Sequence, residues 1–109
     1  MFALVARFDM KDPTAAGQFD ALVERTSAGI MAKEPGTLVY ATHLVDGEPL
    51  GRIFYELYVD RAAFDAHEAQ PHTRTFLEER DRYVATTRVE FMGAGPIVAK
   101  GLPRPAGDE

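Results

Sequence analysis

The 109-residue sequence contains no cysteine. This absence excludes disulfides, thiolate nucleophiles and cysteine-ligated metal sites, and it is typical of a reducing compartment. Long hydrophobic runs are also missing. The apolar run from Phe2 to Ala6 is interrupted by Arg7, so it is too short for a signal peptide or a membrane span. We therefore expect a cytoplasmic protein.

Positive charge is scarce. The chain has 12 Lys and Arg residues against 17 Asp and Glu residues, which leaves a net charge of −5. Proteins that bind nucleic acid need clustered basic residues to neutralise phosphates, and this chain has no such cluster. It also lacks the basic amphipathic stretch typical of a membrane-surface helix. We expect neither nucleic acid nor a membrane among its partners.

The composition that remains is that of one small globular domain. A chain of this length fits a single domain, and its hydrophobic and charged fractions of 46% and 27% are ordinary for such domains. Gly and Pro accumulate only near the C-terminus, from Gly93 onward. We therefore predict a domain over residues 1–95 and an irregular tail over residues 96–109.

Hydrophobic periodicity and turn residues predict seven elements. Asp12-Pro13 favours a helix start, Pro35-Gly36 a helix end, and Asp46-Gly47 a hairpin turn. The predicted strands are residues 2–9, 37–44, 51–59 and 86–92, and the predicted helices are residues 13–34, 61–70 and 72–84. This order predicts an α+β fold of the ferredoxin-like split βαβ type, with a four-stranded antiparallel sheet.

Both faces of this sheet carry large apolar side chains. In the third strand, Tyr55 and Leu57 point to one face, whereas Phe54 and Tyr58 point to the other. A sheet with one face in water would instead alternate between apolar and polar residues. The helices can cover one face, and no other segment remains to cover the second. We therefore expect a homodimer through this second face, which gives a dimeric α/β barrel.

Several segments resemble the antibiotic biosynthesis monooxygenase family. The stretch Glu34–Tyr40 is similar to the family's EPGxxxY entry into the second strand. Residues 54–60 and Ala63–His67 are similar to its segment of the form fYExyxDxxAFxxH, and Pro71-His72 is similar to the spH that follows. The resemblance extends over roughly residues 2–92, and the order of elements matches.

The resemblance implies a dimeric α/β barrel with a substrate pocket between helices and sheet. For some members it implies oxidation of phenolic, quinol-like or polycyclic aromatic substrates by O₂ without metal or flavin. Other relatives degrade haem, isomerise small molecules or have no known activity. The haem-degrading branch resembles this chain least, because its pocket uses a Trp and this chain has none.

A cofactor-free oxygenase of this kind needs a base that deprotonates the phenol in a dry pocket. Imidazole is suited to this role, so His67 is the candidate base, and His72 at the start of the next helix is its candidate supporting residue. His43 is more consistent with a structural or interface role. The three histidines lack the spacing of a metal site, and we predict neither a metal nor another cofactor.

Other residues are candidates for substrate binding. Glu56 lies in the most apolar strand and needs a partner there, for which Arg7, Arg52 and Arg88 are candidates. Glu56 and Arg7 are therefore included among the substrate-binding candidates. The aromatic candidates for the pocket lining are Phe64, Phe76, Tyr40 and Tyr55, although each is also consistent with a core position.

Three functions remain open on the sequence. The first is a cofactor-independent monooxygenase for a phenol, a hydroquinone or a polycyclic aromatic. The second is an isomerase or lyase that transfers protons on the same scaffold. The third is a non-catalytic domain that binds a small ligand or serves a stress response, for which a pocket smaller than one aromatic ring would be evidence.

Overall fold

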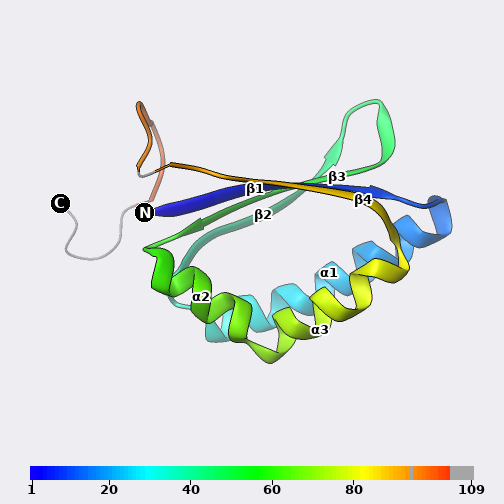
Figure 1. Cartoon of the computed structure of the whole chain (residues 1–109), viewed down its shortest axis with the longest axis horizontal. Coiled ribbons are helices and arrows are strands. Elements are labelled where there is room, and N and C mark those ends of the chain that lie inside the picture. The colour runs from blue at the N-terminus through cyan, green and yellow to red at the C-terminus, as the bar shows by residue number, and fades with distance from the viewer. Residues whose placement is uncertain (94, 104–109) are drawn as a thin grey trace.

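The computed structural model describes residues 1–93 and 95–103, which form an antiparallel four-stranded sheet with helices on one face (Figure 1). The elements are β1 (Phe2–Met10), α1 (Pro13–Lys33), β2 (Thr37–Val45), β3 (Glu48–Tyr58), α2 (Arg61–Ala69), α3 (Pro71–Glu79), the 3₁₀ turn η1 (Arg80–Arg82) and β4 (Val84–Phe91). The strand order is β2-β3-β1-β4, with β2 and β4 at the edges. This topology confirms the predicted ferredoxin-like α+β fold.

Helix α1 begins where the sequence places it. The Asp12 carboxylate accepts a hydrogen bond from the backbone N–H of Ala15 at 2.7 Å, and Pro13 occupies the first turn. The buried side of the helix includes Phe19, Leu22, Val23, Thr26 and Ile30, which recur at helical spacing in the sequence. A cap and a stripe together explain why this segment folds as a helix against the sheet.

Four phenylalanine rings form the centre of the core between helices and sheet. Phe8 of β1 and Phe54 of β3 have ring centroids 4.9 Å apart, and Phe19 and Phe76 pack on them from α1 and α3 at 5.4–6.2 Å. Each buried ring contributes on the order of 1.5–3 kcal/mol to folding. This cluster is what holds α1 and α3 on the same face of the sheet.

Two predicted boundaries differ from the structure by more than two residues. Strand β3 begins at Glu48 rather than Gly51, because Gly47 adopts φ 75° and closes a tight hairpin. The predicted helix over residues 72–84 ends at Glu79 and continues as η1, and Val84 starts β4. Val84 pairs with Met10, and the Tyr83 carbonyl accepts a hydrogen bond from the Lys11 N–H at 2.9 Å. These bonds at the end of β1 end the helix before Tyr83 and place Val84 in the sheet.

The sheet face away from the helices, here called the outer face, carries large apolar side chains as predicted. It carries Val5, Ile53, Tyr55 and Leu57, which alternate with the residues that face the helices. The expectation that no other segment covers this face is wrong at one end. The chain beyond β4 rises on the outer side (Figure 1), and Leu57 is only 2% exposed beside it.

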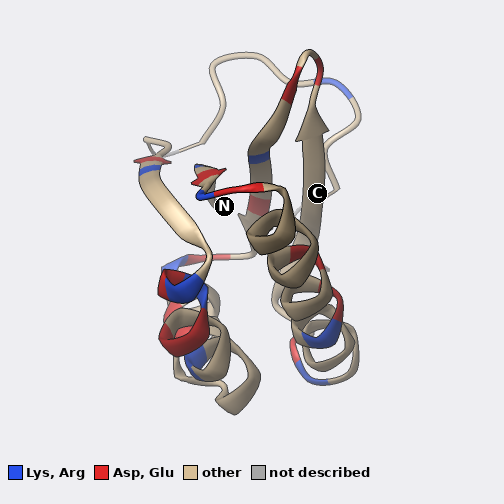
Figure 2. Cartoon of the chain, turned by 90° about the vertical axis from the view of Figure 1, so that its right-hand side faces the viewer, with Lys and Arg blue, Asp and Glu red and all other residues tan. Residues whose placement is uncertain are grey.

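Charges of both signs are spread over the helices (Figure 2). Within residues 1–93 and 95–103, the basic and acidic segments do not separate into a basic face and an acidic face. In the same part of the chain, none of the helices has both the length and the apolar character needed to cross a membrane.

Candidate active site

A cavity of about 170 Å³ lies between the sheet and helices α2 and α3. Its walls combine aromatic rings with a few polar groups, which is the composition of a small-molecule site. The lining residues are Leu4, Ala6, Phe8, Thr26, Tyr40, Phe54, Glu56, Phe64, His67, Glu68, Thr73, Phe76, Leu77, Arg80, Val89 and Phe91.

His67 connects this cavity to a buried polar network. It lies on α2, which begins at Asp60, whose carboxylate accepts from the Ala63 N–H at 2.8 Å. The His67 side chain is 8% exposed, and its Nδ1 lies 2.7 Å from Glu34 Oε1. Its Nε2 lies 3.7 Å from Glu56 Oε1, on the cavity side. One nitrogen is thus held by a carboxylate, and the other is left for the cavity.

Glu34 is the centre of the network, although its side chain is only 4% exposed. It accepts a hydrogen bond from Thr37 Oγ1 at 2.7 Å and bonds His67 through Oε1 and His72 through Oε2. Burial alone would raise the pKa of Glu34, but these hydrogen bonds and the charge of His67 outweigh it and lower the pKa below its ordinary value. Glu34 is therefore a stable carboxylate anchor for both imidazoles.

The local sequence explains how Glu34 reaches this position. Glu34 caps the end of α1, and the Pro35-Gly36 turn then leads into β2. A Cβ at Gly36 would lie 2.7 Å from the Ala63 Cβ, so only glycine lets this turn pack so closely on α2. Since α2 also carries His67, the close approach brings the carboxylate within reach of the imidazole.

His72 is joined to Glu34 but not to the cavity. It lies in the first turn of α3, is 14% exposed, and does not line the cavity. Its ring packs flat against α1, because a Cβ at Gly29 would lie 2.3 Å from His72 Nδ1. The structure thus brings His67 and His72 together through a shared carboxylate, with His67 alone at the cavity wall.

Glu56 forms the other polar part of the wall. Burial raises the pKa of this carboxyl, while a hydrogen bond from Tyr58 and the charge of His67 act in the opposite direction. The Tyr58 hydroxyl donates to Glu56 Oε1 at 2.5 Å. Burial also raises the pKa of Tyr58, so its phenol stays neutral and remains a donor. A carboxyl with a raised pKa beside an imidazole is a pair suited to proton transfer.

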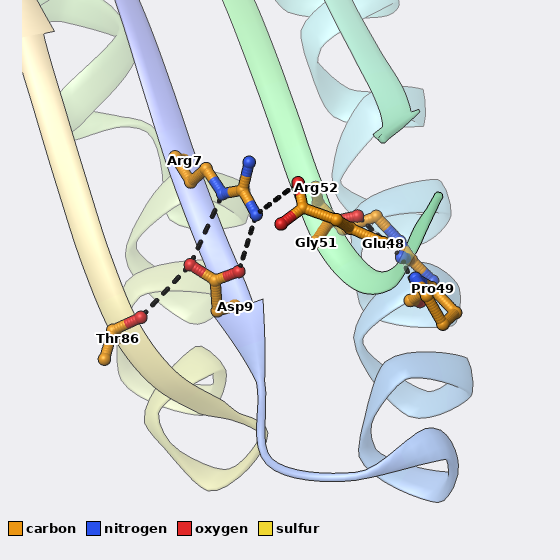
Figure 3. Close-up of polar contacts among 7 residues, drawn as sticks. All are labelled: Arg7, Asp9, Glu48, Pro49, Gly51, Arg52 and Thr86. Atoms are coloured by element: carbon orange, nitrogen blue, oxygen red, sulfur yellow. Dashed lines mark hydrogen bonds and ion pairs between the residues drawn. The ribbon is translucent and has the colours of Figure 1, made fainter. Parts of the chain in front are cut away.

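The arginine partners expected for Glu56 are wrong. Arg7 lies on the outer face and bonds Asp9 at 2.9 Å and Glu48 at 3.1 Å, and Thr86 donates to the same Asp9 (Figure 3). Arg52 faces α1, where its Nε bonds Asp20 at 2.8 Å, and it also donates to two hairpin carbonyls shown in Figure 3. Arg88 bonds Glu90.

The aromatic candidates divide between the two faces of the sheet. Phe64, Phe76 and Tyr40 line the cavity, and burial raises the pKa of the Tyr40 phenol. Tyr55 was expected in the pocket, but it lies on the outer face with Arg7, because neighbouring strand residues point to opposite faces. Neither Arg7 nor Tyr55 can touch a molecule in this cavity.

Several polar residues of the site were not among the sequence candidates. Glu34 was noted only as the first residue of the EPGxxxY motif, and no local pattern signalled Thr37 or Thr73 as part of a site. Arg80 was expected only as a residue of the helix over 72–84, and Tyr58 only as an aromatic residue of the third strand. No group of His, Asp or Glu side chains within residues 1–93 and 95–103 is placed to hold a metal ion.

The fold and the cavity together define an α+β domain of ferredoxin-like topology, with a cavity under its helices that His67 and Glu56 line. The model of the antibiotic biosynthesis monooxygenase family matches residues 1–79, and the chain belongs to this family. No match was found among curated protein sequences.

Solved structures agree with this assignment. A Bacteroides thetaiotaomicron protein described as an antibiotic biosynthesis monooxygenase is 26% identical, with 95% of each chain covered and a TM-score of 0.78. A monooxygenase-like protein from Lactobacillus acidophilus is 27% identical over 83% of this chain and 42% of its own, with a TM-score of 0.77. A Caulobacter crescentus protein is 23% identical over 87% of this chain and 90% of its own. It shares the fold, with a TM-score of 0.80.

Proposed function

We propose that the protein is a cofactor-independent monooxygenase that oxidises a phenolic or hydroquinone substrate with O₂ in the cavity beside His67. The single observation that carries this proposal is the orientation of His67. Its Nδ1 is bound to the Glu34 carboxylate at 2.7 Å, while its Nε2 lies 3.7 Å from Glu56 Oε1, and both His67 and Glu56 line the cavity. This arrangement favours the tautomer in which Nδ1–H donates to Glu34 and Nε2 is the acceptor that a general base needs.

The proposed reaction balances without a further reductant. His67 Nε2 takes the phenol proton, and the phenolate transfers one electron to O₂. The resulting radical and superoxide combine at a ring carbon to form a peroxide anion, and His67 returns the proton to give a hydroperoxide. Loss of water then gives a quinone, so that the substrate loses its O–H and a ring C–H, one oxygen atom enters the ring and the other leaves as water.

The pKa values of the phenols near His67 indicate why a substrate phenol would need a base in this cavity. Burial raises the pKa of the phenols of both Tyr40 and Tyr58, so a substrate phenol in the same environment would also resist ionisation. A base in direct contact overcomes this resistance. Glu56 in its neutral form can donate a hydrogen bond to the phenolate oxygen, which would stabilise the anion in a site of low dielectric constant.

The size of the cavity narrows the proposed substrate. Its volume of about 170 Å³ exceeds the roughly 150 Å³ of an engineered protein cavity that binds benzene. A single aromatic ring with small substituents fits such a space, and a polycyclic substrate would need the cavity to widen. The proposal is therefore for a one-ring phenol or hydroquinone.

The test is O₂ consumption with a panel of one-ring hydroquinones, in protein treated with a chelator and checked for bound flavin. We expect His67→Ala to lower kcat by at least about tenfold, as expected for loss of a general base. His43→Gln is the matched control, because His43 pairs with Ile53 on the outer face. Unchanged turnover in His67→Ala would contradict the proposed base. Turnover that persists without O₂ would indicate an isomerase or lyase instead.

The proposal includes a cytoplasmic homodimer. The apolar outer face supports the dimer, since Val5 and Ile53 lie there without covering helices. The absence of cysteine supports a reducing location. Cell fractionation tests the location, and sedimentation tests the dimer.

A further inference from the structure

Arg80 stands at the cavity wall with an unused hydrogen-bond donor. It is the first residue of η1, and its guanidinium lies 5.7 Å from the centroid of the Phe8 ring. Its Nε is buried, yet among the described residues it has no hydrogen-bond partner. The nearest carboxylate oxygen to this nitrogen belongs to Asp81, at 3.9 Å, on a side chain that is 86% exposed.

An unsatisfied guanidinium nitrogen is costly in a folded protein, because buried donors are almost always paired. Stacking on Phe8 stabilises the cation, but it does not satisfy the Nε–H. The Nε edge of arginine is also the edge that binds carboxylates through two parallel hydrogen bonds. Because Arg80 also lines the ligand-sized cavity, a ligand that brings an acceptor to its guanidinium would satisfy this donor.

Arg80 and the His67–Glu56 pair occupy different ends of the cavity. Glu56 pairs with Leu4 on β1, whereas Phe8, under Arg80, is four residues further along that strand. At a rise of about 3.3 Å per residue, this separates the two sites by about 13 Å along the sheet. The helical side of the cavity gives a similar separation. Thr73 of α3 lies beside His67, with 3.4 Å between Thr73 Oγ1 and His67 Nδ1, and Arg80 follows Thr73 by seven residues, or about 10 Å at 1.5 Å per residue.

The wall between these ends is aromatic. Phe54 and Phe76 both pack against Phe8 and both line the cavity. A ligand that matches this pattern has an acidic hydroxyl at one end, a ring in the middle and an anionic group at the other end.

We infer that the substrate is a one-ring phenol or hydroquinone that carries a carboxylate on a short chain, and that Arg80 binds this carboxylate. This inference rests on the proposed function, because it assigns the hydroxyl end of the same substrate to His67. Arg80 acts here as a specificity-determining residue, since a neutral analogue would leave its Nε–H unpaired.

The test compares two probes of equal shape by anaerobic calorimetry, so that binding is measured without turnover. The probes are 3-(4-hydroxyphenyl)propanoate and its carboxamide. We expect the acid to bind at least about tenfold more tightly than the amide, in keeping with a charge-assisted bond of more than 1.4 kcal/mol. Arg80→Gln should abolish this preference and leave the affinity for the amide within about twofold.

Arg82→Gln is the matched control, because Arg82 lies in the same turn and is exposed. It should keep the preference of the wild-type protein for the acid. Arg80→Lys retains the positive charge but cannot form two parallel hydrogen bonds, so we expect an intermediate preference for the acid. This variant replaces Arg80→Gln in the test if circular dichroism shows that Arg80→Gln is unfolded. Equal affinity for the two probes, equal loss in Arg82→Gln, or no binding of either probe would overturn the inference.

The two proposals fail in different ways. If O₂ uptake by simple hydroquinones occurs but the acid and the amide bind equally, then Arg80 is not the carboxylate site and the oxidation stands. If the preference for the acid is present but no substrate consumes O₂, the binding role of Arg80 stands and the proposed oxidation is wrong.

Discussion

Glu34 holds His67 by one ring nitrogen at 2.7 Å and so leaves the other nitrogen for the cavity. The two residues are 33 positions apart and come from the end of α1 and the last turn of α2. Because the same carboxylate also binds His72 and Thr37, its own position is fixed from three sides. We therefore expect Glu34 to act as a positioning residue for the proposed base, His67.

The first prediction concerns the substitution Glu34→Gln. An amide can present either an oxygen or an N–H to His67, so it no longer selects the tautomer in which Nε2 is the free acceptor. We expect kcat to fall at least about tenfold, with KM changed by less than about twofold, because no contact to the substrate is lost. Steady-state O₂ uptake measures both constants.

The control for this substitution is Glu78→Gln, which makes the same chemical change at an exposed position of α3. It should leave kcat and KM unchanged. A purely structural role of Glu34 would instead lower the fraction of folded protein, with the kcat of the folded fraction preserved. Active-site titration with a tight inhibitor separates these outcomes.

The fold could be predicted from the sequence because its signals are local. The cap at Asp12 and the alternation of β3 each depend only on residues that are close in the sequence. The topology then follows from the order of the helices and strands. The end of α3 could not be predicted this way. Val84 continues the helical pattern, but pairing with Met10 on another strand places it in the sheet.

The site was only partly predictable for the same reason. Glu56 and His67 stand out as a buried carboxylate and a helix histidine, and both line the cavity. Glu34 shows no such signal, since its role depends on a contact 33 residues away. Arg7 was chosen as a charge partner for Glu56 and Tyr55 as an aromatic ring, but strand alternation puts both on the face opposite Glu56.

The second prediction is a pH-dependent effect of Glu56→Gln on stability. Burial raises the pKa of Glu56, so the folded protein binds this proton more tightly than the unfolded chain does. Its contribution to stability is therefore fully present below the ordinary pKa of 4.5 and is lost as the pH rises through the raised value. Glutamine keeps the acceptor for Tyr58 but never ionises.

We therefore expect the melting temperature of Glu56→Gln to match that of the wild-type protein near pH 4 and to exceed it increasingly up to pH 8. Differential scanning calorimetry at several pH values measures the difference. Glu78→Gln is again the control and should show no trend. A difference that shrinks as the pH rises would show that the carboxylate of Glu56 is stabilised, not destabilised, by its surroundings.

The third prediction concerns the outer face. A charge at Val5 would be buried without a partner if a second copy covers this face, and such burial costs several kcal/mol. We expect the wild-type protein to sediment as a dimer at micromolar concentration and Val5→Glu to sediment as a monomer. Ala62→Glu adds the same charge at an exposed position of α2 and should stay dimeric. A monomeric wild-type protein would exclude the dimer.

The last prediction is that two glycines of α1 respond oppositely to the same substitution. A Cβ at Gly29 would lie 2.3 Å from His72 Nδ1, so Gly29→Ala must displace the imidazole from Glu34. We expect a loss of about 1–3 kcal/mol in stability, as for overpacking elsewhere, together with reduced turnover. A Cβ at Gly17 would meet nothing within 4 Å, so Gly17→Ala should gain up to about 1 kcal/mol from helix propensity.

Thermal denaturation of the two variants checks this contrast, since 1 kcal/mol corresponds to a shift of about 4–8 °C in a domain of this size. Because both substitutions add one methyl group to the same helix, helix propensity cancels between them and the difference isolates the contact with His72. Equal melting temperatures would mean that the His72 ring moves away at no cost. In that case the bond between His72 and Glu34 contributes nothing to the folded state, and His67 is positioned by Glu34 and Thr37 alone.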